Sequence, residues 1–202
     1  MNFFKKIIGN FVPSMKEDKS SENNESKYFP DPEIPVDELF TFKFKNNGGK
    51  FIYCENEIEL HENFISILQE NDWFEKEAIT YEKNLQPFLI ENRIFFQNVV
   101  NPIFFLCTCE SLIADDGSIL FSSHQFLHHK SNELPKDIIV IAKTSQITRS
   151  KSDGLRGIKY RYSSNIPSNI TTLQNFKEVV NDNFLQYGIA PKNLYLLLLE
   201  DL

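Results

Sequence analysis

The chain has 202 residues, of which 41% are hydrophobic and 13% aromatic, so it is long enough to bury one good-sized core and falls within the usual single-domain range. Its 21 Lys and Arg residues against 28 Asp and Glu residues give a formal net charge of -7, which repels phosphate backbones and anionic membrane and argues against nucleic acid as a partner. Three cysteines without the spacing of a disulfide framework indicate reduced thiols and a cytoplasmic protein.

The N-terminal segment, residues 1–15, places Phe and Ile residues at helical spacing and predicts an amphipathic helix. Lys5 and Lys6 interrupt the apolar run and no small-residue cleavage site follows, so a signal peptide fits poorly. Residues 16–34 are polar and poor in large aliphatic side chains, which predicts a flexible linker. We expect the helix to pack on its own domain or to order transiently, and contact with a membrane surface or a partner is the less favoured alternative.

From residue 35 onward, runs with the period of a helix alternate with runs rich in strand-forming residues. Helices are predicted over residues 36–47, where Gly48 and Gly49 end the pattern, over 55–71, and over 150–162 with Ser152 or Asp153 as the N-cap. Strands are predicted at residues 50–54, 78–81, 101–109, 118–123, 137–143 and 193–201. This alternation predicts a single α/β domain over residues 35–202, with a mainly parallel sheet, flanking helices and a β-hairpin.

The hairpin is predicted at ESLIADDGSILFSS, residues 110–123, where two acids and a glycine separate two apolar runs. Asp116 and Gly117 supply the two positive-φ positions of a tight type I′ turn. The alternative is that Asp115, Ser118 and the turn amides face a ligand. A catalytic pair of carboxylates is disfavoured, because such a pair needs environments that push two pKa values apart, and adjacent positions do not establish this.

A second candidate site follows the strand at residues 137–143. Ligands of open α/β sheets gather beyond the carboxyl ends of the strands, and this strand is followed by Thr144, Ser145 and the basic residues Arg149 and Arg156. A helix that starts near residue 152 adds backbone N–H groups and a positive dipole end. This edge is therefore a candidate site for a small carboxylate or phosphate, although a solvated basic helix face is the favoured interpretation of these basic residues.

Other residue patterns give weaker signals. Cys107 and Cys109 lie two apart in a strand-like run, and buried reduced thiols are favoured over a metal or redox pair. His124 and His128 would share a helical face, but no acidic or cysteine ligand stands at a zinc spacing, so no metal is predicted. No Gly-x-Ser-x-Gly elbow and no Gly-rich phosphate loop occurs, which disfavours a known hydrolase or a dinucleotide enzyme.

Several segments together resemble the LUD-domain proteins of the lactate-utilisation C family. LIADDGSILFSS resembles the Ala-Glu-Thr-Gly-Thr type hairpin of that family, with residues 114–118 on the motif positions. ELPKDIIVIAKTSQI resembles its Leu-Pro and apolar strand, and NIPSNITTLQNF with YGIAPKNLYLLLLED resembles its Gly-Pro-Ser stretch and C-terminal strand. The resemblance covers residues 35–202 in order. It implies that these residues form a LUD domain with a NagB/RpiA/CoA-transferase-like fold.

The resemblance also implies a function. LUD-domain proteins of this family take part in the cytoplasmic oxidation of L-lactate to pyruvate beside iron-sulfur proteins. This chain lacks C-x-x-C-x-x-C spacing, so we expect it to hold no cofactor, with iron-sulfur clusters only in its partners, and to be an accessory component without activity of its own. The alternative function is a stand-alone binder or transferase of a small anionic metabolite: a carboxylate, a sugar phosphate or a CoA ester.

The chain departs from the family at residues 166–174, which read IPSNITTLQ where many relatives carry Gly-Pro-Ser-Arg-Thr-Ala-Asp-Ile-Glu. Asn169 replaces the arginine and does not bind a carboxylate as an arginine fork does. No catalytic residue is assigned. Glu110 is the nearest candidate for a transfer nucleophile, although a glutamate at a strand end is more typical of a structural role. The candidate ligand-binding residues are Asp115, Asp116, Gly117, Ser118, Thr144, Ser145, Arg149, Arg156, Ser168 and Asn169.

Overall fold

The computed structural model describes residues 34–176 and 192–202. The chain divides into two units, residues 1–34 and 35–202, and the fold given below is that of the second unit. The predicted N-terminal helix, and the predicted linker up to residue 33, lie outside the described residues. Within the part that is described, no helix has both the length and the apolar character that a membrane crossing needs.

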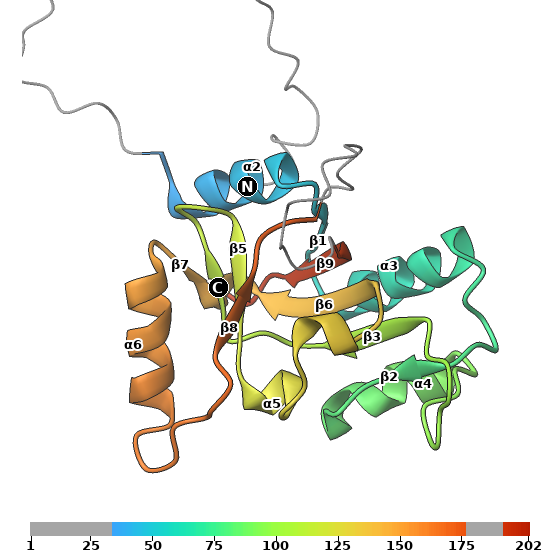
Figure 1. The fold of residues 1–202 in the computed structure, drawn as a ribbon. Helices are drawn as coiled ribbons and strands as arrows, with labels where there is room; N and C mark the ends of the chain where they lie inside the picture. Colours follow the sequence, from blue (N-terminus) through green and yellow to red (C-terminus); the bar gives the residue numbers. More distant parts are fainter. Residues whose placement is uncertain (1–33, 177–191) are drawn as a thin grey trace, which may run out of the picture. The chain divides into compact units, whose positions relative to one another are not determined.

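The centre of the domain is a parallel sheet of five strands, in the order β1-β9-β6-β3-β2 (Figure 1). Its strands are β1 (Lys50–Cys54), β2 (Ala78–Ile79), β3 (Phe104–Cys107), β6 (Asp137–Lys143) and β9 (Asn193–Leu199). Each neighbouring pair is parallel, and the longest ladder joins β6 to β9 over seven residue pairs, from Asp137↔Asn193 to Lys143↔Leu199. The prediction of an α/β domain with a mainly parallel sheet is confirmed.

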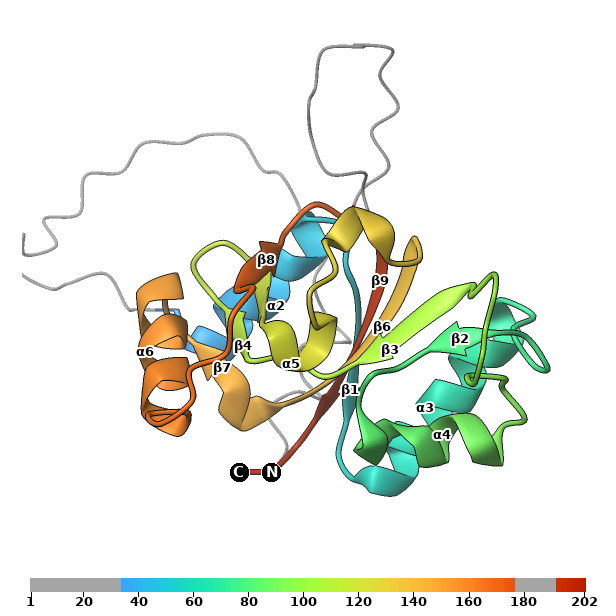
Figure 2. The same cartoon turned by 60° about the horizontal axis from the view of Figure 1, so that its bottom comes forward.

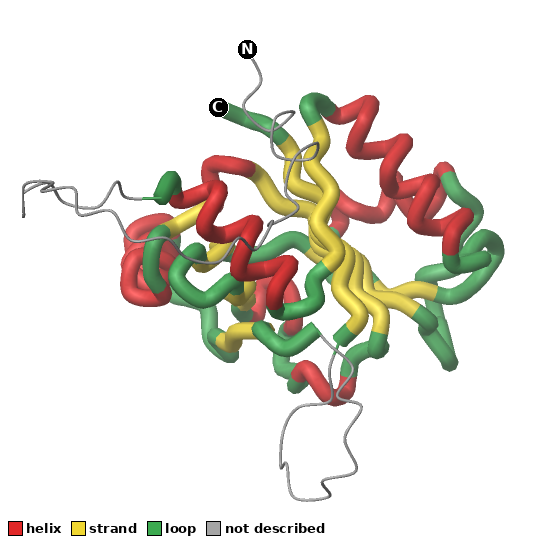
Figure 3. The backbone as a smooth tube through the Cα atoms, turned by 90° about the horizontal axis from the view of Figure 1, so that it is seen from above, coloured by secondary structure: helices red, strands yellow, loops and turns green. Residues whose placement is uncertain are grey.

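Helices cover both faces of this sheet (Figure 3), which explains why its central strands are apolar on both sides. Along β9, Leu194, Leu196 and Leu198 pack in the core beside α2 (Val36–Asn46), whereas Tyr195 and Leu197 pack in the core beside α3 (Glu57–Glu70) and α4 (Gln86–Glu91). The alternation follows from the two-residue period of a strand. The apolar run NLYLLLL therefore supplies both cores at once.

A second sheet of four strands, in the order β7-β4-β5-β8, lies beside the first (Figure 2). Its strands are β4 (Ser111–Ile113), β5 (Ser118–Phe121), β7 (Ile147–Thr148) and β8 (Thr171–Leu173). Helix α6 (Lys151–Arg161) covers it, with Ile158 packed against Ile113 and Leu120. The sequence pattern predicts the hairpin β4–β5 but not this separate sheet.

The loop of the hairpin corrects one prediction. Strand pairing ends at Ile113↔Ser118, so the connection has four residues rather than the two of a type I′ turn. Within this loop, Gly117 has a positive φ, of 68°, and Asp116 does not. The carboxylate of Asp116 accepts hydrogen bonds from the backbone N–H and the hydroxyl of Ser118. The predicted hairpin is confirmed, but the predicted turn type is wrong.

Three other predictions need correction. Helix α6 is capped by Ser150, whose hydroxyl accepts from the backbone N–H of Asp153, and not by Ser152 or Asp153. The strand predicted over residues 101–109 ends at Cys107, because the chain then leaves the central sheet and enters the second one.

The predicted common helical face of His124 and His128 does not form, since α5 (Ser123–Phe126) ends first. The other short helices in the described part of the chain are η1 (Lys83–Leu85), η2 (Ser131–Glu133) and η3 (Thr144–Gln146).

Candidate ligand pocket at the carboxyl edge of the sheet

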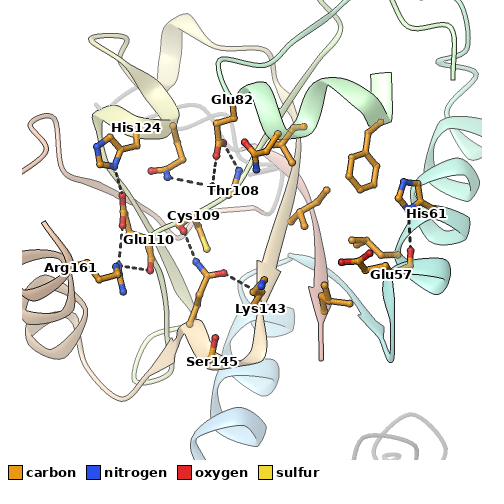
Figure 4. Close-up of a pocket in the computed structure, with 18 of the residues that line it drawn as sticks. Glu57, His61, Glu82, Thr108, Cys109, Glu110, His124, Lys143, Ser145 and Arg161 are labelled. Atoms are coloured by element: carbon orange, nitrogen blue, oxygen red, sulfur yellow. Dashed lines mark hydrogen bonds and ion pairs between the residues drawn. The ribbon is translucent and has the colours of Figure 1, made fainter. Parts of the chain in front are cut away.

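A pocket of about 750 Å³ lies at the carboxyl edge of the central sheet. Its lining comes from the segments that follow β2, β3 and β6, from the end of β9, and from helices α3, α4, α5 and α6 (Figure 4). Parallel strands end at the same edge, where the chain turns away and leaves room for a ligand. A candidate site at this edge is indicated by the sequence, and the pocket of the structure lies at the same edge.

The most buried charge in the pocket is Glu110, whose side chain is 2% exposed. It follows β3, and its backbone N–H donates to Leu120 of the neighbouring hairpin strand, which fixes the residue between the two sheets. Arg161, at the end of α6, donates from Nη2 to the Glu110 carboxylate at 3.0 Å and to the Glu110 backbone carbonyl at 3.0 Å. A buried carboxylate is tolerated only with such partners, because its desolvation is costly.

The other carboxylate oxygen of Glu110 is occupied as well. The hydroxyl of Ser122 donates to Oε1 at 2.7 Å, and Nδ1 of His124 lies 3.3 Å from the same atom. His124 also contacts the ring of Tyr162 edge-on, with centroids 4.5 Å apart. Glu110 therefore lies between Arg161 and His124 and contacts both (Figure 4). In this arrangement, Glu110 positions two donors that line the pocket.

A second carboxylate, Glu82, lines the pocket from the segment after β2. Its Oε1 accepts the backbone N–H of Thr108 at 2.7 Å, and its Oε2 accepts the Thr108 hydroxyl at 2.5 Å. Burial raises the pKa of Glu82, and the nearby charge of Glu110 raises it further, while the Thr108 hydrogen bonds act in the opposite direction. Of these two carboxylates in the lining, Glu110 is paired with a cation and Glu82 has a raised pKa.

The rim after β6 is formed by Lys143, Ser145 and Gln146. The Gln146 amide donates to the carbonyl of Cys109 at 2.6 Å and accepts the backbone N–H of Lys143 at 2.7 Å. Ser145 is fixed by Asp201, which accepts from its backbone N–H and its hydroxyl. Lys143 extends from the strand end toward solvent, 4.0 Å from Asp201. The rim thus adds a second cation, in addition to Arg161, to the lining of the pocket.

The opposite side of the pocket combines a surface of apolar side chains with two polar residues of α3, Glu57 and His61 (Figure 4). The apolar surface is formed by Leu60 of α3, Leu85 of η1, Phe88 of α4, and the strand residues Ile141 and Leu199. His61 stacks on the ring of Phe88, with centroids 4.3 Å apart and planes 7° apart. Figure 4 shows His61 across the pocket from Glu110 and Arg161.

The residues predicted from the sequence lie at three places. Ser145 lines the pocket, and the neighbouring Thr144 donates its hydroxyl to Asp201. Ser168 donates its backbone N–H to Ser123, and the Asn169 amide donates to the carbonyls of Leu127 and His129, close to α5.

The other predicted residues gather at the hairpin loop and on α6, outside the pocket lining. Asp115 pairs with Arg149 at 3.4 Å, and Asp116, beside Gly117 and Ser118, pairs with Lys151 at 2.7 Å. Arg156 is paired with Asp153 on its own helix. Ligand binding by these residues stays a prediction, but the structure does not bring them together in one site.

The cysteines follow the predicted pattern of buried thiols. Among the described residues, Cys54, Cys107 and Cys109 are reduced and buried. Cys109 lines the pocket, but burial raises the pKa of its thiol strongly, so the unreactive protonated form dominates. Over residues 34–176 and 192–202, no three His, Cys, Asp or Glu side chains are grouped as a metal site requires.

The sequence patterns do not single out Glu82 or Arg161. They bring up His124 only as a possible metal ligand, and Glu110 as a possible transfer nucleophile or, more typically, a structural glutamate. These residues are 82, 110, 124 and 161 in the chain, and no motif with fixed spacing links them. One local signal was present: Glu110 is the only charged residue in the apolar run PIFFLCTCESLIA, and a lone charge in such a run needs a buried partner. The identity of that partner depends on the second sheet, which places the end of α6 beside β4.

Comparison with known structures supports the fold. The crystal structure of a DUF162 family protein from Deinococcus radiodurans matches 82% of this chain and 96% of that chain, with a TM-score of 0.58 and 12% sequence identity. DUF162 corresponds to the LUD-domain proteins, so the fold is one that occurs in that family. No family model matches the sequence, and no curated protein matches it.

Proposed function

We propose that this chain binds a small carboxylate in the pocket at the carboxyl edge, and does so as the non-iron-sulfur component of a cytoplasmic system that oxidises L-lactate to pyruvate. The observation that carries the binding proposal is the cluster of Glu110, Arg161 and His124. A buried carboxylate whose two oxygens are both occupied is not itself a ligand-binding group. Its role is to hold donors for something else.

Arg161 is the principal donor of this binding site. Its guanidinium carries five N–H groups in a fixed fork, more than the contacts with Glu110 use, and this geometry suits a carboxylate. Lys143 on the rim adds positive charge, and His124 adds an imidazole ring whose nitrogen atoms can donate or accept a hydrogen bond. Asn169 replaces the arginine that many LUD relatives carry in the Gly-Pro-Ser stretch, and in our proposal Arg161 supplies the fork instead.

The role in lactate oxidation is supported by the ordered resemblance of residues 35–202 to LUD-domain proteins and by the fold shared with a DUF162 protein. Removing two electrons from a 2-hydroxy acid requires an acceptor. The sequence carries neither cluster-type cysteine spacing nor a dinucleotide loop, so in our proposal the electrons pass to iron-sulfur partners. The purified chain should therefore leave lactate unoxidised until such partners are added.

The alternative, a stand-alone binder or transferase of a different anion such as a sugar phosphate or CoA ester, is favoured by Lys143. This side chain is largely exposed at the rim, and a lysine ammonium suits a phosphate as a point charge. Tight binding of glucose 6-phosphate or acetyl-CoA, with no association with iron-sulfur proteins, would favour the alternative.

The test is isothermal titration of the purified chain with L-lactate, pyruvate, glucose 6-phosphate and acetyl-CoA. Arg161→Lys keeps a positive charge beside Glu110 but removes the fork, so it should weaken carboxylate binding by about tenfold. The matched control is Lys159→Gln, which removes a positive charge from an exposed position of the same helix outside the pocket lining and should leave binding unchanged. Lack of binding of either carboxylate by the parent chain would defeat the proposal, as would equal affinity of the parent and Arg161→Lys.

A further inference from the structure

The pocket is much larger than lactate. Lactate has roughly six non-hydrogen atoms, whereas pockets of about 300 to 1,000 Å³ enclose ligands of drug size. The volume here is about 750 Å³. A lactate molecule held by Arg161 would leave most of this space to water, including the space against the apolar side. Water against an apolar wall is unfavourable, and a ligand that covers the wall gains binding free energy.

The apolar side is organised around an aromatic ring. Phe88 is half-buried and is held between two neighbours: His61 stacks on it at 4.3 Å, and Phe64 meets it edge-on at 5.3 Å. Leu60 and Leu85 extend the same surface. A ring held in this way is fixed before a ligand arrives, so a ligand ring that packs against this wall orders few further side chains.

The polar and apolar ends lie on different elements. Arg161, His124 and Glu110 come from α6, α5 and the segment after β3, while His61 and Phe88 come from α3 and α4. Figure 4 shows the labelled members of the two groups on opposite sides of the pocket. A ligand that reaches both ends can place an anionic group at Arg161 and an apolar group against Phe88, whereas the carboxylate of Glu57 on the far side disfavours a second anionic group there.

We propose that the ligand is a 2-hydroxy or 2-oxo acid whose side chain ends in an aromatic ring. Its carboxylate binds at Arg161, and its ring packs against Phe88, Leu60 and Leu85. The carboxylate half of this assignment rests on the proposed function. The aromatic half rests on the size of the pocket and the composition of its far side.

The experiment compares three probes by isothermal titration: L-lactate, 3-phenyllactate and 2-hydroxyhexanoate. We expect 3-phenyllactate to bind at least about tenfold more tightly than L-lactate, because burial of its benzyl group removes apolar surface from water. It should also bind more tightly than 2-hydroxyhexanoate, whose flexible chain loses more freedom on binding. Phe88→Leu should abolish most of the preference for 3-phenyllactate over L-lactate.

Phe88→Leu keeps an apolar side chain packed against the core, and thermal unfolding of the variant checks that it is folded. The matched control is Ile90→Ala, on the same helix, whose side chain is 62% exposed and does not line the pocket. If 3-phenyllactate binds no more tightly than L-lactate, the inference is overturned while the proposed function stands. Tighter binding that is unchanged in Phe88→Leu, or matched by 2-hydroxyhexanoate, also overturns it. If none of the three acids binds, the proposed function fails and the inference fails with it.

Discussion

Strand β4 has an acidic residue beyond each of its ends, and the two acids differ in exposure and in the number of their partners. Glu110 precedes the strand, is 2% exposed, and is bound by Arg161, Ser122 and His124. Asp115 lies just beyond the other end, is 52% exposed, and pairs with Arg149 at 3.4 Å. Each end thus joins an acid to an arginine, but only one of them removes the acid from water.

This difference in burial decides what each pair does. An exposed ion pair in water contributes little to stability, since solvent screens the attraction and two long side chains lose freedom. A buried carboxylate depends on its partners, because losing one leaves a charge that water cannot reach. The two acids that stand out in the sequence, adjacent in a turn, can therefore lose a partner at little cost in stability. The single glutamate inside an apolar run cannot.

The largest expected effect belongs to the hairpin loop, and it comes from the backbone rather than from the acids. A Cβ added at Gly117 would lie 2.5 Å from the backbone of Lys43 and of Phe44 in α2, and the φ of Gly117 is 68°. Gly117→Val should lower the free energy of unfolding by about 3 kcal/mol or more, or prevent folding. Urea denaturation measures the change. Gly157→Ala in α6, where an added Cβ meets only the end of Arg161 at 3.5 Å, is the control and should be neutral or slightly stabilising.

The next largest effect should be at Glu110. Glu110→Gln keeps the shape of the side chain but removes the charge that pairs with Arg161 and introduces a donor where only acceptors fit. The free energy of unfolding should fall by about 2 kcal/mol. Asp115→Asn is the matched change at the exposed end and should stay within about 0.5 kcal/mol of the parent. Equal losses at the two positions would show that burial does not separate the two ends of β4.

Much of the fold could be predicted from local patterns in the sequence. The apolar runs of β6 and β9 are longer and more continuous than a half-buried strand requires, which indicates a parallel sheet covered on both faces. Gly48, at φ 90°, ends α2 as predicted. Each of these signals lies within a few residues of the feature that it predicts.

The edge of the sheet that holds the pocket could be predicted from the sequence, but the residues that line the pocket could not. Arg161 is 51 positions from Glu110, and their contact exists because α6 packs on a sheet that local patterns did not reveal. The predicted turn type of the hairpin loop was wrong for a related reason. Asp116 and Gly117 have the composition of a type I′ turn, but the end of strand pairing at Ile113↔Ser118 sets the loop length, and strand pairing is a tertiary property.

A smaller effect should appear in the pH dependence of stability. Burial raises the pKa of Glu82 above its ordinary value of 4.5, so the folded protein binds this proton more tightly than the unfolded chain does. Glu82 therefore favours folding when protonated, and this contribution is lost as pH rises from about 4.5 through the raised value. Glu82→Gln should remove that loss, so that its stability relative to the parent increases with pH over this range. Urea denaturation at pH 4, 5, 6 and 7 measures it.

Asp116 gives the opposite sign and serves as the comparison. Although burial acts to raise its pKa, hydrogen bonds from Lys151 and Ser118 outweigh it and lower the pKa below the ordinary value of 3.8. This carboxylate favours folding when ionised, so its contribution is present above about pH 4 and is lost as pH falls through the lowered value. Asp116→Asn should therefore lose stability relative to the parent at pH 6 and recover part of it below pH 4. The same sign at both positions would contradict the assignment.

The smallest expected effect is the coupling between Asp115 and Arg149. Their contact is a single 3.4 Å approach between two side chains that are each about half exposed, so solvent screens the attraction and the side chains keep much of their freedom. A double-mutant cycle with Asp115→Asn and Arg149→Gln, measured by urea denaturation, should give a coupling below about 0.5 kcal/mol that declines further in about 0.5 M NaCl. A coupling above about 1 kcal/mol that persists in salt would mean that the exposed end of β4 behaves like the buried one. Asp115 would then be held as firmly as Glu110, and the prediction that the hairpin loop binds a ligand would gain support from a rigid, charged surface.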